Sequence, residues 1–181
     1  MARHHFGRGE YQYFAYPLPA LVEGLRNGAY AQLAPIADRW NEALGVPARF
    51  PATQQQFLAQ CFESEQRRPT ALLLRYGAGD YNCLHQDVYG PVAFPFQLTA
   101  FLSEPGEDFD GGEFVLVEGR PRSQSRPICI VPRRGDVLIV PNKYRPVRGE
   151  RGFYRTTFRH GVSEVRRGER FTLGIILHDA L

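Results

Sequence analysis

From Thr70 onward the sequence consists of short apolar or alternating runs, and glycine or proline separates each run from the next. Alternation with a period of two predicts β-strands, and glycine and proline between the runs predict turns. We expect strands at residues 71–76, 82–87, 96–102, 113–117, 127–131, 136–140, 154–158 and 170–177. About eight short strands in one stretch of chain favour a double-sheet jelly roll.

The residues before Thr70 have helical spacing instead. Pro17 and Pro19 open a segment that Gly28 closes, so a first helix is expected there. A second helix is predicted by apolar residues at helical spacing: Leu33, Ile36, Ala37, Trp40 and Leu44. A third helix is predicted by a capping box and a buried stripe: Thr53, Gln56, Phe57, Leu58, Cys61 and Phe62.

The predicted fold is therefore α+β, a double-stranded β-helix (jelly roll) with an N-terminal helical layer packed on one sheet. We expect the layer to comprise residues 1–69 and the jelly-roll core residues 70–181. A chain of 181 residues is long enough for one such domain and short for two.

The apolar runs and the cysteines of the sequence indicate the cellular location of the protein. No apolar run approaches the roughly 18 residues of a membrane span, and the first residues lack the apolar section of a secretory signal. The three cysteines, Cys61, Cys83 and Cys129, are widely spaced, as reduced thiols are. We expect a cytoplasmic protein without membrane association, and nothing indicates an obligate protein partner.

The run Asn-Cys-Leu-His-Gln-Asp at residues 82–87 carries the clearest chemical signal. Alternation places Cys83, His85 and Asp87 on one face of the strand. One further histidine would complete the facial triad of non-haem Fe(II) oxygenases, and His160 can supply it. We predict that His85, Asp87 and His160 are the metal ligands and the catalytic residues. An exposed His–Asp pair is the alternative, since the short pattern also arises by chance.

Arg170 follows His160 by ten residues and opens the last apolar run, with Thr172 on the same face. A buried guanidinium needs an anion, and the distal carboxylate of 2-oxoglutarate would provide one through paired hydrogen bonds. A salt bridge from Arg170 to an internal carboxylate is the alternative. Tyr76 ends the run before residues 77–80, so its hydroxyl is a candidate for the same cosubstrate, or Tyr76 is an ordinary core residue.

These motifs resemble two branches of the Fe(II)- and 2-oxoglutarate-dependent oxygenases. Residues 76–87 look like the metal-binding strand of the AlkB-type nucleic-acid demethylases, including the L-H-Q-D run. Three later features resemble the prolyl-hydroxylase branch: GGEF at 111–114, GDVLIV at 135–140, and His160 with a basic residue ten positions later. With residues 11–19 and 35–40, the chain is similar to a bacterial oxygenase family labelled as oxidative demethylation of damaged DNA.

The resemblance implies an enzyme that uses Fe(II), 2-oxoglutarate and O2. It would hydroxylate a C–H bond and form succinate and CO2, and a hydroxylated N-methyl group would then leave as formaldehyde. The three predicted ligands would hold the iron, and Arg170, Tyr76 and Thr172 would bind the cosubstrate. One feature departs from the AlkB pattern: residues 171–177 contain no arginine, where those enzymes have an R-x-N-x-x-x-x-x-R run.

Positive charge is concentrated late in the chain. Residues 120–170 include 14 basic and 4 acidic residues, and among the 22 basic residues of the protein only Lys143 is not arginine. Arginine binds phosphate in a bidentate manner and stacks on bases. The candidates for contact with nucleic acid are Lys143, Arg145, Arg148, Arg151 and Arg155. We expect residues 142–152 to form a loop, and an ordinary solvated face is the alternative.

Three functions are compatible with the sequence. The first is oxidation of an alkylated base in DNA or RNA, and the second is hydroxylation of a protein side chain (prolyl-type) or a small molecule. The third is a jelly-roll binding module without turnover. The sequence does not determine the oligomeric state, whether residues 142–152 close over substrate, or the roles of Cys83, Gln97 and His178. A strand that carries Gln97, Thr99 and Phe101 is expected to line the pocket.

Overall fold

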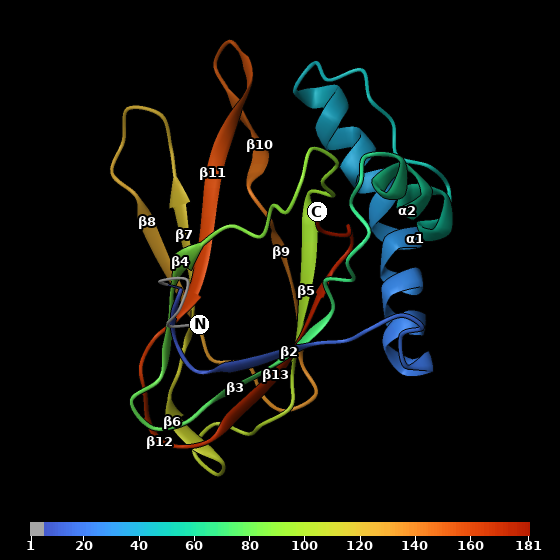
Figure 1. Ribbon diagram of the computed structural model, residues 1–181. Helices are drawn as coiled ribbons and strands as arrows, with labels where there is room; N and C mark the ends of the chain where they lie inside the picture. Colours follow the sequence, from blue (N-terminus) through green and yellow to red (C-terminus); the bar gives the residue numbers. More distant parts are fainter. Residues whose placement is uncertain (1–5) are drawn as a thin grey trace.

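The computed structural model describes residues 6–181 as two facing antiparallel sheets, with two helices on the outer face of one sheet (Figure 1). The first sheet has six strands in the order β1-β4-β11-β7-β8, and β10 also pairs with β11. The second sheet has five strands in the order β2-β3-β13-β5-β9. A short pair of strands, β6 and β12, lies at one end (Figure 1).

The strands of the first sheet are β1 (Gly7–Arg8), β4 (Tyr81–His85), β7 (Phe114–Gly119), β8 (Arg126–Ile130), β10 (Tyr144–Gly149) and β11 (Gly152–Val162). Those of the second sheet are β2 (Glu10–Tyr13), β3 (Leu72–Tyr76), β5 (Phe96–Phe101), β9 (Val137–Pro141) and β13 (Arg170–Ile176). The short pair is β6 (Phe109–Gly111) and β12 (Val165–Gly168), and the helices are α1 (Ala20–Ala43) and α2 (Gln54–Glu63).

The predicted jelly roll is confirmed, because all eight runs expected to be strands are strands and form two facing sheets. The expectation of a loop at residues 142–152 is wrong. β10 pairs with β11 from Tyr144 to Gly149, so this segment is one arm of a hairpin. The sequence of β10, Tyr-Arg-Pro-Val-Arg-Gly, has no apolar alternation, and its strand conformation comes from pairing with the longer β11.

The helical layer consists of one long helix and one short helix. The predicted helix end at Gly28 is wrong, because α1 continues through Gly28 and Pro35. Gly28 is exposed, while the residues that α1 buries on either side, such as Arg26 and Tyr30, hold both halves against the sheet. The predicted capping box is present, with the Thr53 side chain accepting from the backbone of Gln56.

The third predicted helix, α2, is less buried than its spacing indicates. Phe57 and Cys61 lie in the core, but Phe62 is 57% exposed and the guanidinium of Arg67 lies over its ring, with Cζ 4.4 Å from the centroid. Phe62 was expected in the buried stripe, and this expectation is wrong. A long cationic side chain that covers an aromatic ring allows the ring to stay at the surface.

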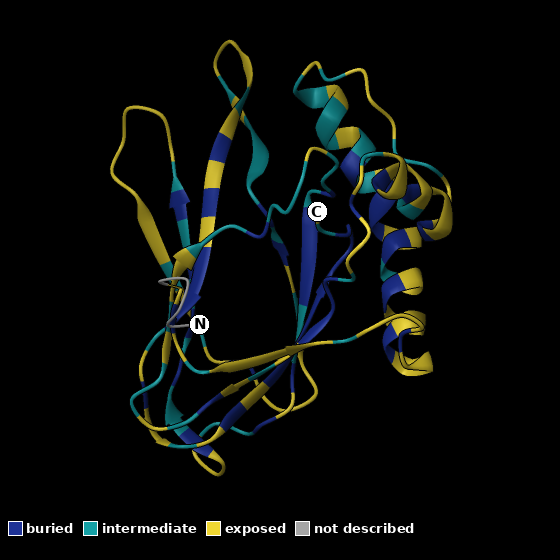
Figure 2. Cartoon of the chain, viewed as in Figure 1, coloured by how far each residue is buried: buried dark blue, intermediate teal, exposed yellow. Residues whose placement is uncertain are grey.

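Two groups of buried apolar residues hold the layers together. One joins the helices to the second sheet through residues such as Tyr30, Phe57 and Ile175. The other lies between the sheets and includes Phe101 and Phe158. Figure 2 shows the pattern, with buried residues on the side of α1 that faces the sheet and exposed residues on the opposite side. The second sheet is therefore covered on both faces, by the helices on one and by the first sheet on the other, as a jelly roll with an added helical layer requires.

Residues 1–69 are a helical layer only in part. Residues 7–8 and 10–13 form β1 and β2, and these pair with β4 in the first sheet and with β3 in the second. The N-terminal segment was expected to be helical, and its short polar strands gave no apolar alternation that would predict otherwise. Neither helix of the described chain combines the length and apolar character needed to cross a bilayer.

Candidate active site

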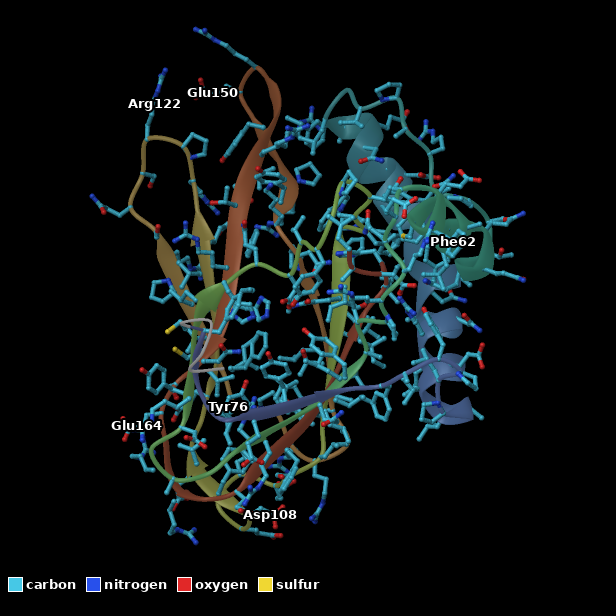
Figure 3. The ribbon with its side chains drawn as sticks, viewed as in Figure 1. Phe62, Tyr76, Asp108, Arg122, Glu150 and Glu164 are labelled. Carbon is cyan, nitrogen blue, oxygen red and sulfur yellow. The ribbon has the colours of Figure 1, made fainter. Side chains whose placement is uncertain are left out.

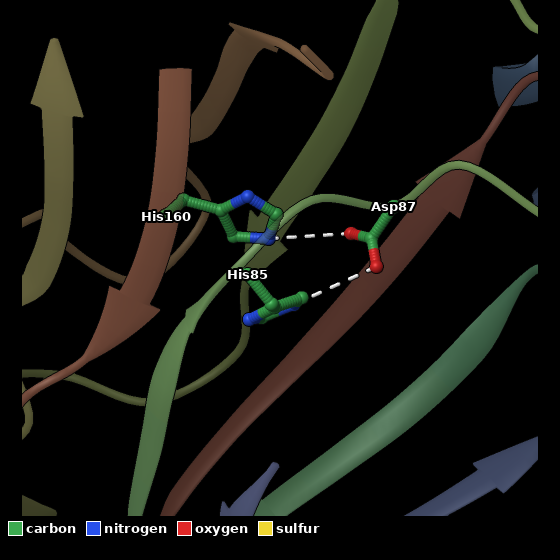
Figure 4. Close-up of side chains that lie close together, drawn as sticks. All are labelled: His85, Asp87 and His160. Carbon is green, nitrogen blue, oxygen red and sulfur yellow. Dashed lines mark ion pairs between the residues drawn. The ribbon is translucent and has the colours of Figure 1, made fainter. Parts of the chain in front are cut away.

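The structure brings together the three residues predicted as metal ligands. His85 ends β4, Asp87 follows two residues later, and His160 lies near the end of β11, which pairs with β4 at His85. Nε2 of His160 is 3.2 Å from one carboxylate oxygen of Asp87, and Nε2 of His85 is 3.5 Å from the other (Figure 4). One candidate ligand atom from each residue lies within 4.8 Å of those of the other two.

These separations suit a shared metal ion. Ligand atoms that each lie about 2.1 Å from one ion, at right angles, are about 3 Å from one another. The donor set of two imidazoles and one carboxylate is that of the facial triad, which leaves positions on the metal for other ligands. The alternative of an exposed His–Asp pair does not hold, because Asp87 is buried and the side chain of His85 is only 14% exposed.

A β-bulge aims His85 into the interior. His160 pairs with His85 and Val162 pairs with Asn82, so two steps along β11 correspond to three along β4. The extra residue breaks the alternation, and both Asn82 and His85 line the interior cavity. Cys83 was expected to share the face of His85, and this expectation is wrong: Cys83 is exposed on the outer face.

Glycine is required opposite the bulge. A Cβ at Gly161 would lie 2.6 Å from the carbonyl oxygen of Asn82, closer than van der Waals contact allows. β11 can therefore approach the bulged part of β4 only because residue 161 has no side chain. This close approach sets the position of His160 relative to His85.

The electrostatics favour the protonation states that a metal needs. Burial, and then the nearby imidazole of His160, lower the pKa of His85, although Asp87 opposes them, so His85 is neutral near pH 7. Burial alone would raise the pKa of Asp87, but the hydrogen bond and charge of His160 and the charge of His85 outweigh it and hold that pKa well below its usual range. The carboxylate is therefore ionised.

Neighbouring groups fix the orientation of each candidate ligand. Nδ1 of His85 is 2.7 Å from the carbonyl oxygen of Cys83, so a proton on Nδ1 would leave Nε2 free as a donor atom. The hydroxyl of Tyr89 donates to Asp87 Oδ1 at 2.5 Å. The ring of Phe114 stacks on His160 with centroids 5.7 Å apart. Tyr89 and Phe114 were not predicted, since nothing in their sequence context indicates which residues face the ligands.

Arg170 has the environment of an anion-binding residue. It is 1% exposed, and within residues 6–181 none of its three guanidinium nitrogens has a hydrogen-bond partner. Its Cζ lies 5.5 Å from the ring centroid of Tyr76 and 5.2 Å from that of Phe101. Burial lowers the pKa of Arg170 to about 10, so it is still charged at neutral pH. The alternative of an internal salt bridge does not hold for the described residues.

Arg170 and the three candidate ligands line one cavity of about 130 Å³, roughly ten times the volume that a single water molecule needs. Tyr76, Thr172, Gln97 and Thr99 also line it. Figure 3 shows Tyr76 among the side chains between the two sheets. The Tyr76 hydroxyl accepts from Nδ2 of Asn82 at 3.2 Å, and burial raises its pKa, so it remains protonated.

The structure shows the surroundings of Gln97 and His178, whose roles the sequence does not determine. Gln97 is buried with Nε2 3.0 Å from Nε2 of His160, while its carbonyl oxygen has no partner among residues 6–181. His178 is buried outside the cavity, where Nδ1 accepts from the backbone N–H of Phe94 at 3.3 Å. Burial lowers the pKa of His178 to about 4, so it is a neutral core residue and not a fourth member of the cluster.

The mouth of the cavity contains aromatic side chains from the N-terminus. Phe6, Tyr11 and Tyr13 line it, and the ring of Phe6 meets that of His85 edge-on at 5.6 Å. These residues were not assigned to the site from the sequence. Nothing in the local sequence shows that residues 10–13 form a strand that pairs with β3.

Four of the predicted nucleic-acid residues lie on the β10–β11 hairpin, which extends beyond the sheets, and Lys143 directly precedes it (Figure 1). In Figure 3, Glu150 marks its tip and Arg122 marks the neighbouring β7–β8 turn. Arg145 is partly neutralised, because it pairs with buried Glu118 at 3.1 Å. The remaining four, Lys143, Arg148, Arg151 and Arg155, have no ion pair within residues 6–181.

Comparison with known proteins agrees with this site. The family described as "Oxygenase, catalysing oxidative methylation of damaged DNA" matches residues 9–180. Uncharacterized proteins from two strains of Mycobacterium tuberculosis are 44% identical over 167 residues, which is 92% of this chain and 72% of theirs.

Among solved structures, an oxidoreductase of the 2OG-Fe(II) oxygenase family from Burkholderia pseudomallei aligns with 96% of this chain and 67% of its own. The TM-score is 0.50 and the identity 18%, a likeness of fold. A Pseudomonas putida prolyl-4-hydroxylase aligns at 18% identity over 92% of this chain and 90% of its own, but its TM-score of 0.38 supports no argument. The chain belongs to the Oxygenase-NA family, since the family model covers residues 9–180.

Proposed function

We propose that this oxygenase removes an alkyl group from a base in DNA or RNA by oxidising it. The observation that carries the chemistry is that a His-Asp-His cluster and a buried, unpaired arginine line the same cavity. The description of the family supplies the substrate class, damaged DNA. Hydroxylation of an N-methyl group gives an N-hydroxymethyl group, whose C–N bond breaks to release formaldehyde and leave N–H on the base.

His85, Asp87 and His160 would hold Fe(II), since their donor set and spacing fit it. Arg170 would bind the distal carboxylate of 2-oxoglutarate with two charge-assisted hydrogen bonds, with Thr172 and Tyr76 beside it. Iron with 2-oxoglutarate and O2 supplies the oxidation of an unactivated C–H bond.

The chain's own groups prepare the site for this chemistry. Tyr89 holds the carboxylate of Asp87 with its hydroxyl, and the raised pKa of Tyr89, caused by burial and by Asp87, keeps that hydroxyl protonated. Phe114 and Phe6 pack against the two imidazoles and limit access of water to them. The base to be oxidised would enter between these rings, past Tyr11 and Tyr13.

The substrate proposal rests further on the basic hairpin. Lys143, Arg148, Arg151 and Arg155 are positive charges without ion pairs in the described chain. Lys143 directly precedes an extended hairpin formed partly by the strand that carries His160, and the other three lie on that hairpin. Charges of this kind bind phosphate groups in a salt-dependent way. We propose that the hairpin contacts the nucleic-acid backbone, and that the helices and the jelly roll act as one domain because they share a core.

A turnover assay tests the proposal. The protein is supplied with Fe(II), 2-oxoglutarate and an oligonucleotide that contains an N-methylated base, and succinate and formaldehyde are measured. We expect equal amounts of both, no formaldehyde from the unmethylated oligonucleotide, and loss of both products in Arg170→Met. Succinate release driven by a proline-containing peptide and not by methylated nucleic acid would contradict the substrate and favour the hydroxylase alternative.

A further inference from the structure

A second cavity, of about 400 Å³, lies between the C-terminal end of α1, residues 88–95 and the start of the β10–β11 hairpin. In Figure 1, β10 runs beside α1 at this end of the molecule. The cavity shares no lining residue with the metal cavity, but Val88, the residue after Asp87, forms part of its wall. Gln86, the residue before Asp87, donates to the carbonyl of Phe158 at 2.7 Å and so ties this segment to the hairpin.

The walls of this cavity are fixed by buried amides. Gln66 holds the segment 88–95, because its Oε1 accepts from the N–H of Val92 at 2.7 Å and its Nε2 donates to the carbonyl of Val92 at 2.8 Å. Gly90 packs directly on Gln66, and a Cβ there would lie 2.3 Å from Gln66 Cδ. Asn142, which is 1% exposed, donates to the carbonyl of Phe94 at 2.8 Å. The cavity is thus formed before any ligand binds.

The lining combines aromatic rings with unneutralised positive charge. Trp40 and Tyr144 line the cavity together with Lys143 and Arg155. Lys143 Nζ is 5.1 Å and Arg155 Cζ is 5.6 Å from the centroid of the Tyr144 ring. Neither cation has an ion pair with any of residues 6–181. Cations that bind phosphate, next to rings on which a base can stack, are the combination that recognises single-stranded nucleic acid.

We propose that this cavity binds one nucleotide of a single-stranded substrate. The adjoining nucleotide of the same strand would then enter the metal cavity. This inference rests on the proposed function and adds a second, separate contact to it. An enzyme that acts on one base must hold the strand beside that base, and single-stranded or unstacked substrate leaves the adjoining nucleotide free to enter a cavity. Val88 and Asp87 are consecutive, so one short segment contributes to the walls of both cavities.

The chain provides its own probe, because Trp40 is its only tryptophan and lines the cavity. A short oligothymidylate is titrated into the protein at several salt concentrations while tryptophan fluorescence is recorded. We expect saturable quenching. In the double variant Lys143→Gln/Arg155→Gln the quenching is lost, and the salt slope of the residual binding, measured by fluorescence anisotropy of a labelled oligothymidylate, is smaller by about 1.4, since each phosphate contact on a single strand contributes about 0.7. Tyr144→Leu weakens binding about tenfold through loss of stacking.

The matched control is Arg67→Gln/Arg68→Gln, which removes the same charge from exposed side chains beyond α2 and is expected to leave the quenching unchanged. The inference would be overturned, with the proposed function intact, by the following result. A methylated single strand is turned over, the fluorescence of Trp40 does not change, and the KM of Lys143→Gln/Arg155→Gln equals that of the wild type. Failure of methylated strands to be turned over at all would remove the proposed function, and the inference with it. Equal quenching by duplex and single strand would also contradict a site for an unpaired nucleotide.

Discussion

Replacement of Arg170 by methionine is expected to stabilise the protein and abolish its response to 2-oxoglutarate. Methionine has a similar volume, is unbranched and carries no charge, so it can fill most of the space between Tyr76 and Phe101. The guanidinium of Arg170 has no hydrogen-bond partner within residues 6–181, and a charge in that position is a cost to folding in the absence of its anion.

The size of the expected stabilisation follows from the lowered pKa of Arg170. Burial lowers the pKa of Arg170 from 12.5 to about 10, so the folded state holds this proton less tightly than the unfolded state, and the penalty is fully present at every pH below about 10. At about 1.4 kcal/mol per pH unit, the penalty is about 3 kcal/mol. Cation–π contacts with two rings offset it by about 1 kcal/mol each. The net gain of Arg170→Met is therefore about 1 kcal/mol, or a rise in Tm of about 3 °C for a chain of this size.

Thermal unfolding followed by circular dichroism, with Mn²⁺ in place of Fe(II), measures both effects. The Tm of the wild type should rise when 2-oxoglutarate is added, and that of Arg170→Met should not. The control is Arg75→Met, an exposed arginine that pairs with Glu10, and it should keep the response. A Tm for Arg170→Met several degrees below that of the wild type would show that Arg170 is structural and refute the reasoning.

Three further predictions follow from other contacts. Tyr89→Phe removes the hydrogen bond to Asp87 and should lower the affinity for Co²⁺ or Mn²⁺ by about 10- to 100-fold in a metal titration; an unchanged affinity would contradict it. Gly161→Ala forces a Cβ against the carbonyl of Asn82 and should lower the free energy of unfolding in urea by about 1–3 kcal/mol, whereas an unchanged midpoint would show that the strands can separate there. The pKa of His178 is lowered from 6.5 to about 4, so only the unfolded state gains its proton between these values, and the free energy of unfolding should fall by about 3 kcal/mol as the pH drops from 6.5 to 4. His178→Gln should flatten this slope, and an identical slope in the variant would assign it to other groups.

Structural features that depend only on residues close in the sequence were predicted correctly. Alternation along one strand identified the inner face of β13, where Arg170 and Thr172 both line the cavity, and the capping box located the start of α2. Each of these features is decided within a few residues, so the sequence alone contains the necessary information. The pair His85 and Asp87 was found from its short His-x-Asp motif, which is also local.

Features that depend on a distant partner were not predicted. The bulge that turns Cys83 outward exists because β4 must match β11 beside Gly161, and alternation within β4 gives no sign of it. β1, β2 and β10 are strands because of what they pair with, and α1 passes through Gly28 because its flanking residues are buried against the second sheet. Tertiary pairing and burial overrode local preference in each case.

The N-terminal strands determine how the cavity can open. β1 and β2 are edge strands of different sheets, each hydrogen-bonded to one neighbour, whereas β11, which carries His160, is paired on both sides. Edge pairing breaks in local openings that cost much less than global unfolding. Amides of residues 7–13 should therefore exchange with solvent long before those of β11, and the aromatic wall of the cavity can move aside while the candidate metal ligands keep their places.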